Sequence, residues 1–205
     1  MAEGNDLTPS ERSINDIQKN QQEFKKTFKS IIESKFPGWI DEINNKQSSI
    51  LSIGFGGTAT EFLPLDQEFP NAKLFGIDVG DFALTKDEVE IISEKKLNIY
   101  LKRADAGKEE SYLDDTGEPI KADLVVIRSP NIGTGGNWKN VMKQAWGHLN
   151  PEGILYVTVN NDFELKRTKE LLADVEIAIQ EPIRNPNPHE KTVYFSEVYI
   201  LIAQK

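Results

Sequence analysis

From residue 49 onward, short β-rich runs alternate with helical stretches, and this alternation constrains the fold more than any other feature of the sequence. Five strands are predicted in this part of the chain, at residues 50–53, 73–78, 98–102, 123–128 and 154–159. Four helices are predicted between or after them, at residues 60–68, 86–95, 138–149 and 163–173. Such alternation is typical of right-handed βαβ units that build a parallel sheet. The apolar run 122–128 indicates a strand that is buried on both faces.

The end of the sequence breaks this alternation. Residues 175–181 and 193–203 are both β-rich, but the segment between them, 182–189, is rich in proline and fits no helix. Neighbouring strands without a crossover helix have to pair antiparallel. The sheet is therefore predicted to finish in an antiparallel hairpin.

Residues 1–46 are expected to form a separate N-terminal part of the chain. Apolar residues recur at steps of three, four and seven from Ile14 to Ile32, which predicts one amphipathic helix of about 20 residues. Pro37 and Gly38 end this helix, and a further short helix follows from Trp39. The polar face of the long helix mixes both signs of charge, which does not favour a membrane anchor. We expect this part to cap the domain formed by residues 47–205.

The charge and the cysteine count exclude several function classes. With 24 Lys and Arg against 33 Asp and Glu, the net charge is −9, which argues against an extended nucleic-acid surface. The sequence has no cysteine and two histidines, so no metal site is predicted. His148 lies near the end of a predicted helix, where a partly positive imidazole suits the helix dipole. No apolar run is long enough for a membrane span and no signal-peptide pattern is present, so a cytoplasmic protein is expected.

A glycine-rich turn, residues 54–57, follows the first predicted strand and precedes a helix. Glycines permit a tight turn and let backbone amides approach a nucleotide closely. Asp78 ends the next strand, 24 residues after Gly54, where nucleotide-binding folds place a carboxylate that accepts hydrogen bonds from ribose hydroxyls. A second acid, Asp105, follows the third strand. The turn and the two acids together predict a nucleotide-binding site.

These motifs, in this order, resemble those of the class I S-adenosylmethionine-dependent methyltransferases, and the resemblance covers about residues 47–205. The strand 122–127 and the turn 149–153 resemble the fourth strand of that family and the turn before its fifth strand. The resemblance implies an α/β fold with a Rossmann-like, mostly parallel seven-stranded sheet and helices on both faces. It also implies the strand order 3-2-1-4-5-7-6, with an antiparallel C-terminal hairpin, and S-adenosyl-L-methionine as the cofactor.

The resemblance further implies which residues bind the cofactor. Asp78 would bind the ribose, and Asp105 would bind the adenine amino group. The expected cofactor site consists of Ser52, Gly54, Phe55, Gly56, Gly57, Asp78, Val79, Asp105, Ala106 and Arg128. Two positions depart from the family pattern: Ser52 stands where the family has an acid that helps to hold the methionine end, and Thr58 stands where it has a third glycine.

The residues that follow the fourth strand are expected to face the acceptor. Segment 129–132 partly matches a signature of amino-group methyltransferases, in which Asp, Asn or Ser is followed by two prolines and an aromatic residue. Ser129 or Asn131 would orient an acceptor, and Arg128 would bind its carboxylate or phosphate, so these three are the candidate catalytic residues. The alternative is a tight turn in which Arg128 forms an ion pair with Asp105 or with a surface acid.

The sequence is compatible with three functions. The first is a methyltransferase that transfers a methyl group to a small-molecule acceptor, with no nucleic-acid or membrane partner and with a homodimer left open. The departures at Ser52 and Thr58 are compatible with a non-catalytic binding protein of the same fold. The spacing of Gly54, Gly56 and Ala59 also fits a nicotinamide-dependent oxidoreductase, although the chain has no Tyr-x-x-x-Lys pair.

Overall fold

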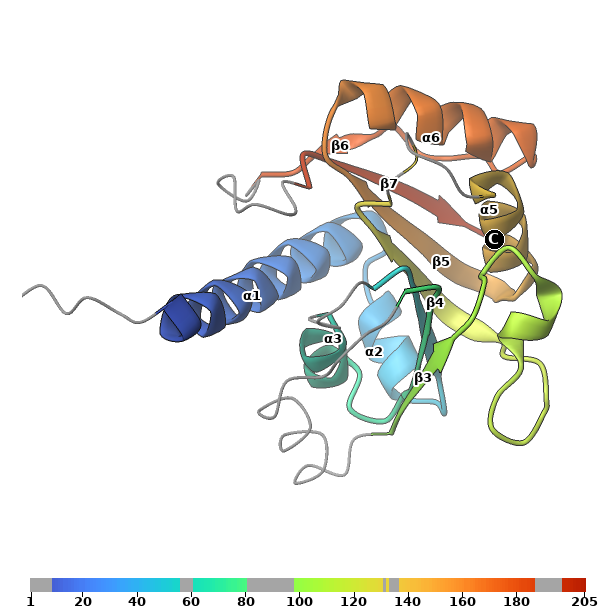
Figure 1. Ribbon diagram of the computed structural model, residues 1–205, viewed down its shortest axis with the longest axis horizontal. Coiled ribbons are helices and arrows are strands. Elements are labelled where there is room, and N and C mark those ends of the chain that lie inside the picture. The colour runs from blue at the N-terminus through green and yellow to red at the C-terminus, as the bar shows by residue number, and fades with distance from the viewer. Residues whose placement is uncertain (1–8, 56–60, 81–97, 131, 133–136, 187–196) are drawn as a thin grey trace, which may run out of the picture.

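The computed structural model in Figure 1 describes residues 9–55, 61–80, 98–130, 132, 137–186 and 197–205. Its helices are α1 (Pro9–Lys35), α2 (Trp39–Asn44), α3 (Phe62–Glu68), the 3₁₀ helix η1 (Glu109–Tyr112), α5 (Trp138–Gly147) and α6 (Asp162–Asp174). Its strands are β1 (Ser49–Ile53), β2 (Lys73–Asp78), β3 (Ile99–Arg103), β4 (Ala122–Arg128), β5 (Leu149–Val159), β6 (Ile183–Arg184) and β7 (Tyr199–Gln204).

The seven strands form one sheet in the order β3-β2-β1-β4-β5-β7-β6. Strands β1 to β5 are parallel to one another, whereas β7 runs antiparallel to both β5 and β6. Every residue of β4, at the centre of the sheet, is buried, as its apolar sequence predicts. The predicted sheet, strand order and C-terminal hairpin are therefore confirmed.

Alternate residues of each strand point to two different hydrophobic clusters, one on each face of the sheet. In β4, Leu124 and Val126 pack with α1, α2 and α3, while Val125 and Ile127 pack with α5 and α6. Figure 1 shows the two groups of helices on opposite sides of the sheet. Helices therefore cover both faces, as expected for this fold.

Helix α1 contributes directly to the core. Phe24, Phe28, Ile31 and Ile32 recur on its buried face, and the Phe28 ring packs edge-on against Tyr156 of β5 with 5.2 Å between the ring centroids. The helix is longer than predicted, because it begins at Pro9 and ends at Lys35. Helices α1 and α2 share one core cluster with the sheet, while the division of the chain after residue 46 stays a prediction.

The first strand of the C-terminal hairpin was predicted in the wrong place. Residues 175–181 do not form a strand, because Glu176 adopts a left-handed backbone with φ 60° and the amide of Ile177 donates to the Leu172 carbonyl, which ends α6. The strand β6 lies instead inside the proline-rich segment and pairs with Tyr199 and Ile200 of β7. The predicted helix 86–95 lies outside the described residues.

Strand β5 starts five residues earlier than predicted. It begins at Leu149, which pairs with Ala122, and the register of the β4–β5 pairing then shifts before Leu124 meets Ile154. The turn-like sequence 150–153 is accommodated at this irregularity. No helix in the described part of the chain is long and apolar enough to cross a membrane.

Candidate functional site

The carboxyl ends of β1, β2 and β3 meet at one edge of the sheet. Gly54, directly after β1, has a φ of +68° and donates its amide to the Ile77 carbonyl at 2.8 Å. The Asp78 carbonyl at the end of β2 accepts the amide of Ala104 at 2.8 Å, and Asp105 follows at once. The structure therefore places the start of the glycine turn, Asp78 and Asp105 along the same edge, where parallel α/β sheets bind their ligands.

Local hydrogen bonds orient the two carboxylates at this edge. Oδ1 of Asp78 accepts the amide of Gly80 at 2.7 Å, and Oδ1 of Asp105 accepts the amide of Gly107 at 2.9 Å. Such bonds to an amide two residues on restrict the side chain to a narrow range of directions. Between these acids, Val79 is 71% exposed, which is rare for a large apolar side chain in this structure.

The neighbouring predicted residues are placed as follows. Ala106 is buried, and its carbonyl accepts the Tyr112 hydroxyl at 2.9 Å. The ring of Phe55 turns into the core and packs edge-on against Phe62 at 5.4 Å between centroids. A β-carbon on Gly54 would lie 3.8 Å from Cη2 of Trp138, so the side chain of the first residue of α5 lies beside Gly54. The predicted residues Gly56, Gly57 and Asn131 lie outside the described residues.

Ser52 and Arg128 belong to a buried polar cluster between the sheet and α1. The Ser52 hydroxyl donates to Oε1 of Glu61 at 2.6 Å. The Arg128 guanidinium lies 3.7 Å from Oε2 of Glu61 and donates from Nε to Oε1 of Glu197 at 2.5 Å. The Phe24 ring of α1 covers the guanidinium at 4.4 Å. The Arg128 side chain is only 8% exposed, and its ion-pair partners are these two buried glutamates rather than the predicted Asp105 or a surface acid.

Burial is the largest single influence on the pKa values of both Glu61 and Arg128. It raises the pKa of Glu61, and the nearby Glu197 adds to this effect, whereas Arg128 and Ser52 oppose it. Burial also acts to lower the pKa of Arg128, but the carboxylates of Glu197 and Glu61 outweigh it and raise that pKa overall. The Arg128 guanidinium already binds two carboxylates. Its role in catalysis stays a prediction.

The turn after β4 is held by residues that the sequence interpretation missed. Ser129 has a φ of 44°, and its hydroxyl donates to Oδ1 of Asn160 at 2.9 Å. Glu197, with a φ of 39°, donates its amide to the same Oδ1 at 3.1 Å, and its carboxylate accepts the Thr158 hydroxyl at 3.2 Å. Left-handed non-glycine residues often mark functional sites. The sequence did offer a signal for Thr158 and Asn160, because both are polar residues at the end of a predicted buried strand.

His148 lies at the C-terminal end of α5, but its surroundings disfavour the positive charge that was predicted from this position. Its Nδ1 lies 2.8 Å from the Ile120 carbonyl, and its ring stacks on Tyr112 at 4.4 Å between centroids. Burial lowers the pKa of this imidazole below its ordinary value near 6.5. His148 therefore has a structural role at the C-terminal end of α5.

A separate cavity of about 440 Å³ lies along the edge strand β3. Its lining is mostly apolar and includes the stacked rings of Phe75 and Tyr100 together with Leu113 and Ile120. Asp78 and Asp105 do not line it. Within the described residues, no group of three or more His, Asp or Glu side chains is arranged to hold a metal ion.

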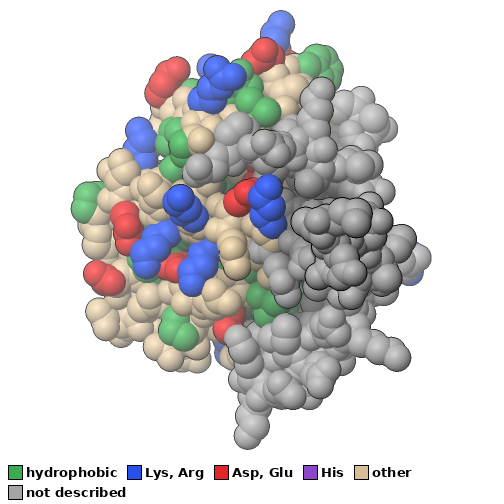
Figure 2. All heavy atoms as spheres, turned by 90° about the vertical axis from the view of Figure 1, so that its left-hand side faces the viewer, with side chains coloured by type: hydrophobic (Ala, Val, Ile, Leu, Met, Phe, Trp, Pro, Cys, Tyr) green, Lys and Arg blue, Asp and Glu red, His purple; other side chains and the backbone are tan. Residues whose placement is uncertain are grey.

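Basic and acidic side chains are interspersed on the described part of the face shown in Figure 2. Ion pairs also join residues of different helices: Lys25 and Lys29 of α1 both contact Glu68 of α3, at 3.3 and 3.1 Å. Nucleic-acid binding usually requires a continuous basic surface. The described part of this face shows a mixed charge pattern instead.

No protein-family model matches the sequence, and the comparison with curated proteins found no match. Several solved structures are similar, however. A 1,6-didemethyltoxoflavin-N1-methyltransferase from Burkholderia thailandensis, with S-adenosylhomocysteine bound, matches with a TM-score of 0.53 and 11% identity over 100% of this chain and 93% of that chain. The plantazolicin methyltransferase, also with S-adenosylhomocysteine, matches with a TM-score of 0.53 and 13% identity over 96% and 91% of the two chains.

A precorrin-6y C5,15-methyltransferase from Geobacter metallireducens matches with a TM-score of 0.50 and 18% identity, over 81% of this chain and 85% of that chain. A ribosomal protein L11 methylase from Lactobacillus delbrueckii matches with a TM-score of 0.52 and 18% identity, over 82% and 74%. Among eight of the similar structures, the share of the other chain that is covered ranges from 48% to 93%. At these identities the likeness establishes the fold.

Proposed function

The chain has the class I methyltransferase fold, and on this premise we propose that it is an S-adenosylmethionine-dependent methyltransferase with a small-molecule acceptor. The observation that supports the proposal most is the meeting of the Gly54 turn, Asp78 and Asp105 at one edge of the sheet. Two of the similar structures contain S-adenosylhomocysteine, the product of methyl transfer, in the same fold.

The residues at this edge fit an adenosyl group by their chemistry. Asp78, which the Gly80 amide orients, would accept hydrogen bonds from ribose hydroxyls. Asp105 would accept the adenine amino group, and the exposed side chain of Val79 would contact the flat base. Gly54 has the left-handed backbone that a close turn around a ligand requires.

The bound cofactor would supply a methyl group on a sulfonium, which is already activated toward an attacking electron pair. The protein would therefore contribute mainly by positioning the acceptor and by excluding water. Ser129 and Asn131 remain our candidates for positioning it, and the bond from Ser129 to Asn160 fixes the start of this turn. The net charge of −9 favours a small molecule over a nucleic acid as the acceptor.

Calorimetric titration with S-adenosylhomocysteine tests this proposal. We expect micromolar binding to the folded protein and a loss of at least tenfold in affinity for Asp78→Asn, because the amide no longer offers two acceptor oxygens to a ribose. Asp174→Asn, which alters an exposed carboxylate on α6, is the matched control and should bind as tightly as the wild type. A folded wild type that does not bind at millimolar ligand contradicts the proposal.

A non-catalytic binding protein of the same fold is the second candidate. It is favoured by Ser52, at the position of the family's acid, and by the engagement of Arg128 in buried ion pairs. The two candidates differ in turnover and not in cofactor binding. Transfer of labelled methyl groups to any component of a cell extract supports the enzyme, whereas tight binding of S-adenosylhomocysteine without transfer supports the second candidate. The similar structures named above are all methyltransferases, so none of them favours the nicotinamide alternative.

A further inference from the structure

The segment that follows β3, residues 105–112, is held by two buried side chains of η1. The Ser111 hydroxyl donates to the Asp105 carbonyl at 2.6 Å, and the Tyr112 hydroxyl donates to the Ala106 carbonyl at 2.9 Å. Ser111 is 3% exposed and Tyr112 is fully buried. Two consecutive side chains therefore hold two consecutive carbonyls of the backbone. We refer to residues 105–112 as the Asp105 loop.

Tyr112 is itself fixed by residues outside this loop. Its ring stacks on the His148 ring at 4.4 Å between centroids, with 14° between the two planes. The Tyr112 carbonyl accepts the amide of Ile120 at 2.8 Å, and the Ile120 carbonyl lies 2.8 Å from Nδ1 of His148. Burial raises the pKa of Tyr112, so its phenol stays protonated and remains a hydrogen-bond donor. The Asp105 loop is therefore attached through Tyr112 to the C-terminal end of α5.

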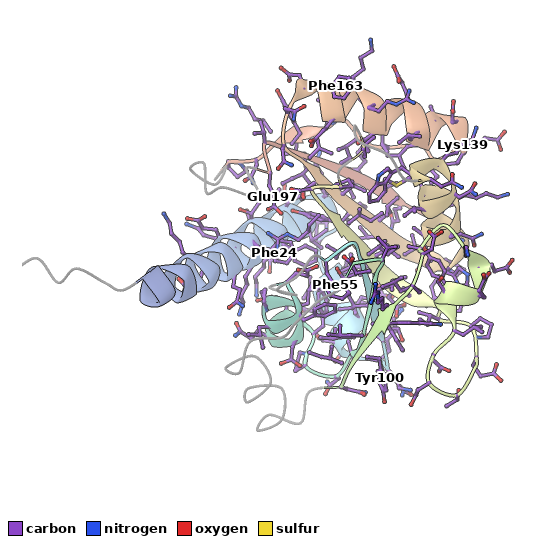
Figure 3. All side chains as sticks on the ribbon, viewed as in Figure 1. Phe24, Phe55, Tyr100, Lys139, Phe163 and Glu197 are labelled. Carbon is purple, nitrogen blue, oxygen red and sulfur yellow. The ribbon has the colours of Figure 1, made fainter. Side chains whose placement is uncertain are left out.

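The Asp105 loop also contacts the first turn of α5. A β-carbon on Gly107 would lie 3.7 Å from Cβ of Asn137 and 3.6 Å from Cβ of Asn140. In Figure 3, the loop lies between β3, on which Tyr100 is labelled, and α5, on which Lys139 is labelled. The loop is thus in contact with α5 near both ends of that helix, and its position is set by this packing.

The direction of the Asp105 carboxylate depends on these contacts. Asp105 is exposed, and an exposed side chain ordinarily samples several rotamers. Here Oδ1 of Asp105 accepts the Gly107 amide at 2.9 Å, so the carboxylate follows the backbone between these two residues. The bonds from Ser111 and Tyr112 hold that backbone. Removing one of these hydroxyls should therefore loosen the carboxylate.

We propose that Tyr112 is a positioning residue, which together with Ser111 makes the site selective for a purine that carries an amino group. This inference rests on the proposed function, in which Asp105 accepts the adenine amino group. A hydrogen bond weakens steeply when its distance or angle departs from the ideal, so a carboxylate selects an amino group only when it is held in place. Tyr112 is fully buried, and its effect on the ligand passes through the backbone of Ala106 and Asp105.

The test compares S-adenosylhomocysteine with its 6-deamino analogue, in which hydrogen replaces the amino group of the base. Calorimetry gives both dissociation constants for the wild type and for Tyr112→Phe, which keeps the stacked ring and removes only the hydroxyl. We expect the wild type to prefer S-adenosylhomocysteine roughly tenfold, because the analogue lacks the hydrogen bond to the carboxylate. In Tyr112→Phe this preference should fall to about twofold, and the loss should affect S-adenosylhomocysteine alone. Ser111→Ala should show the same fall.

Two controls separate positioning from a general loss of stability, which would weaken both ligands equally and leave their ratio unchanged. In an Asp105→Ala background the ratio should be near one, and adding Tyr112→Phe should not alter it, because the carboxylate through which Tyr112 acts is missing. Tyr199→Phe is the matched control, since the Tyr199 hydroxyl donates to Asp162 of α6, and β7 and β3 lie on opposite sides of β4 in the sheet. Its ratio should stay at the wild-type value.

A ratio near one in the wild type overturns the inference, because Asp105 would then not select the amino group. A folded Tyr112→Phe that keeps the wild-type ratio overturns it as well, whether both ligands bind as before or both bind more weakly by the same factor. If Tyr112→Phe does not fold, Ser111→Ala decides by the same criterion. These results leave the proposed cofactor intact. No binding of S-adenosylhomocysteine to the folded wild type overturns the proposed function, and this inference with it.

Discussion

Arg128 shows how a charged residue is accommodated inside this protein. Removing a guanidinium from water costs several kcal/mol unless paired carboxylates and aromatic rings replace its hydration. Glu61, Glu197 and the ring of Phe24 do so here. The position of Arg128 at the end of a buried strand was predictable from its sequence. Its partners were not, because Glu197 lies 69 residues further along the chain and only the completed sheet brings it close.

His148 gives a prediction for the pH dependence of stability. Burial lowers the pKa of this imidazole in the folded protein, whereas the unfolded chain protonates it near pH 6.5. The contribution of the neutral His148 imidazole to the free energy of unfolding is therefore fully present above pH 6.5. It is lost as the pH falls from that value toward the lower pKa of the folded state. Urea unfolding at pH 7.5 and 5.5 should show a larger loss of stability for the wild type than for His148→Gln. Equal losses in the two proteins contradict this role.

At the scale of elements, the strands predicted best were those whose bounds follow from their own local sequence. Strand β2 has the predicted bounds, and β1, β3 and β4 differ by one residue, because each is a short apolar run between turns. Strand β6 could not be predicted, since two residues carry no periodicity and their pairing depends on β7. The connection from β3 to β4 has only η1 and an isolated bridge from Leu113 to Pro119, and the cavity beside β3 lies next to it.

Helix α1 stabilises the sheet through its aromatic residues, which gives a second prediction. Phe28 is fully buried and contacts Phe24, Phe69 and Tyr156. Phe28→Ala should lower the free energy of unfolding by about 3–5 kcal/mol, because the cavity adds to the lost burial.

The matched control is Phe163→Ala on α6, whose ring is 66% exposed; it should change the stability by less than about 0.5 kcal/mol. Urea unfolding measures both variants. Similar small effects for the two would show that α1 is dispensable for the sheet.

At the scale of the whole molecule, the strand order explains why a site could be predicted at all. Gly54, Asp78 and Asp105 are far apart in sequence, but parallel neighbours β1, β2 and β3 bring their carboxyl ends together. The position of the site could be predicted because these strands are neighbours and run parallel. The ion pairs of Arg128 with Glu61 and Glu197 depend on side-chain packing that no spacing in the sequence encodes, and so these two glutamates became evident only in the structure.

The most direct test of the central claim is a crystal structure of the protein grown with S-adenosylhomocysteine. We predict density for the adenosyl group at the carboxyl edge of β1, β2 and β3, with the ribose hydroxyls on the Asp78 carboxylate and the adenine amino group near Asp105. Ligand density in the cavity beside β3 instead, or an edge that stays empty at saturating ligand, would contradict the account.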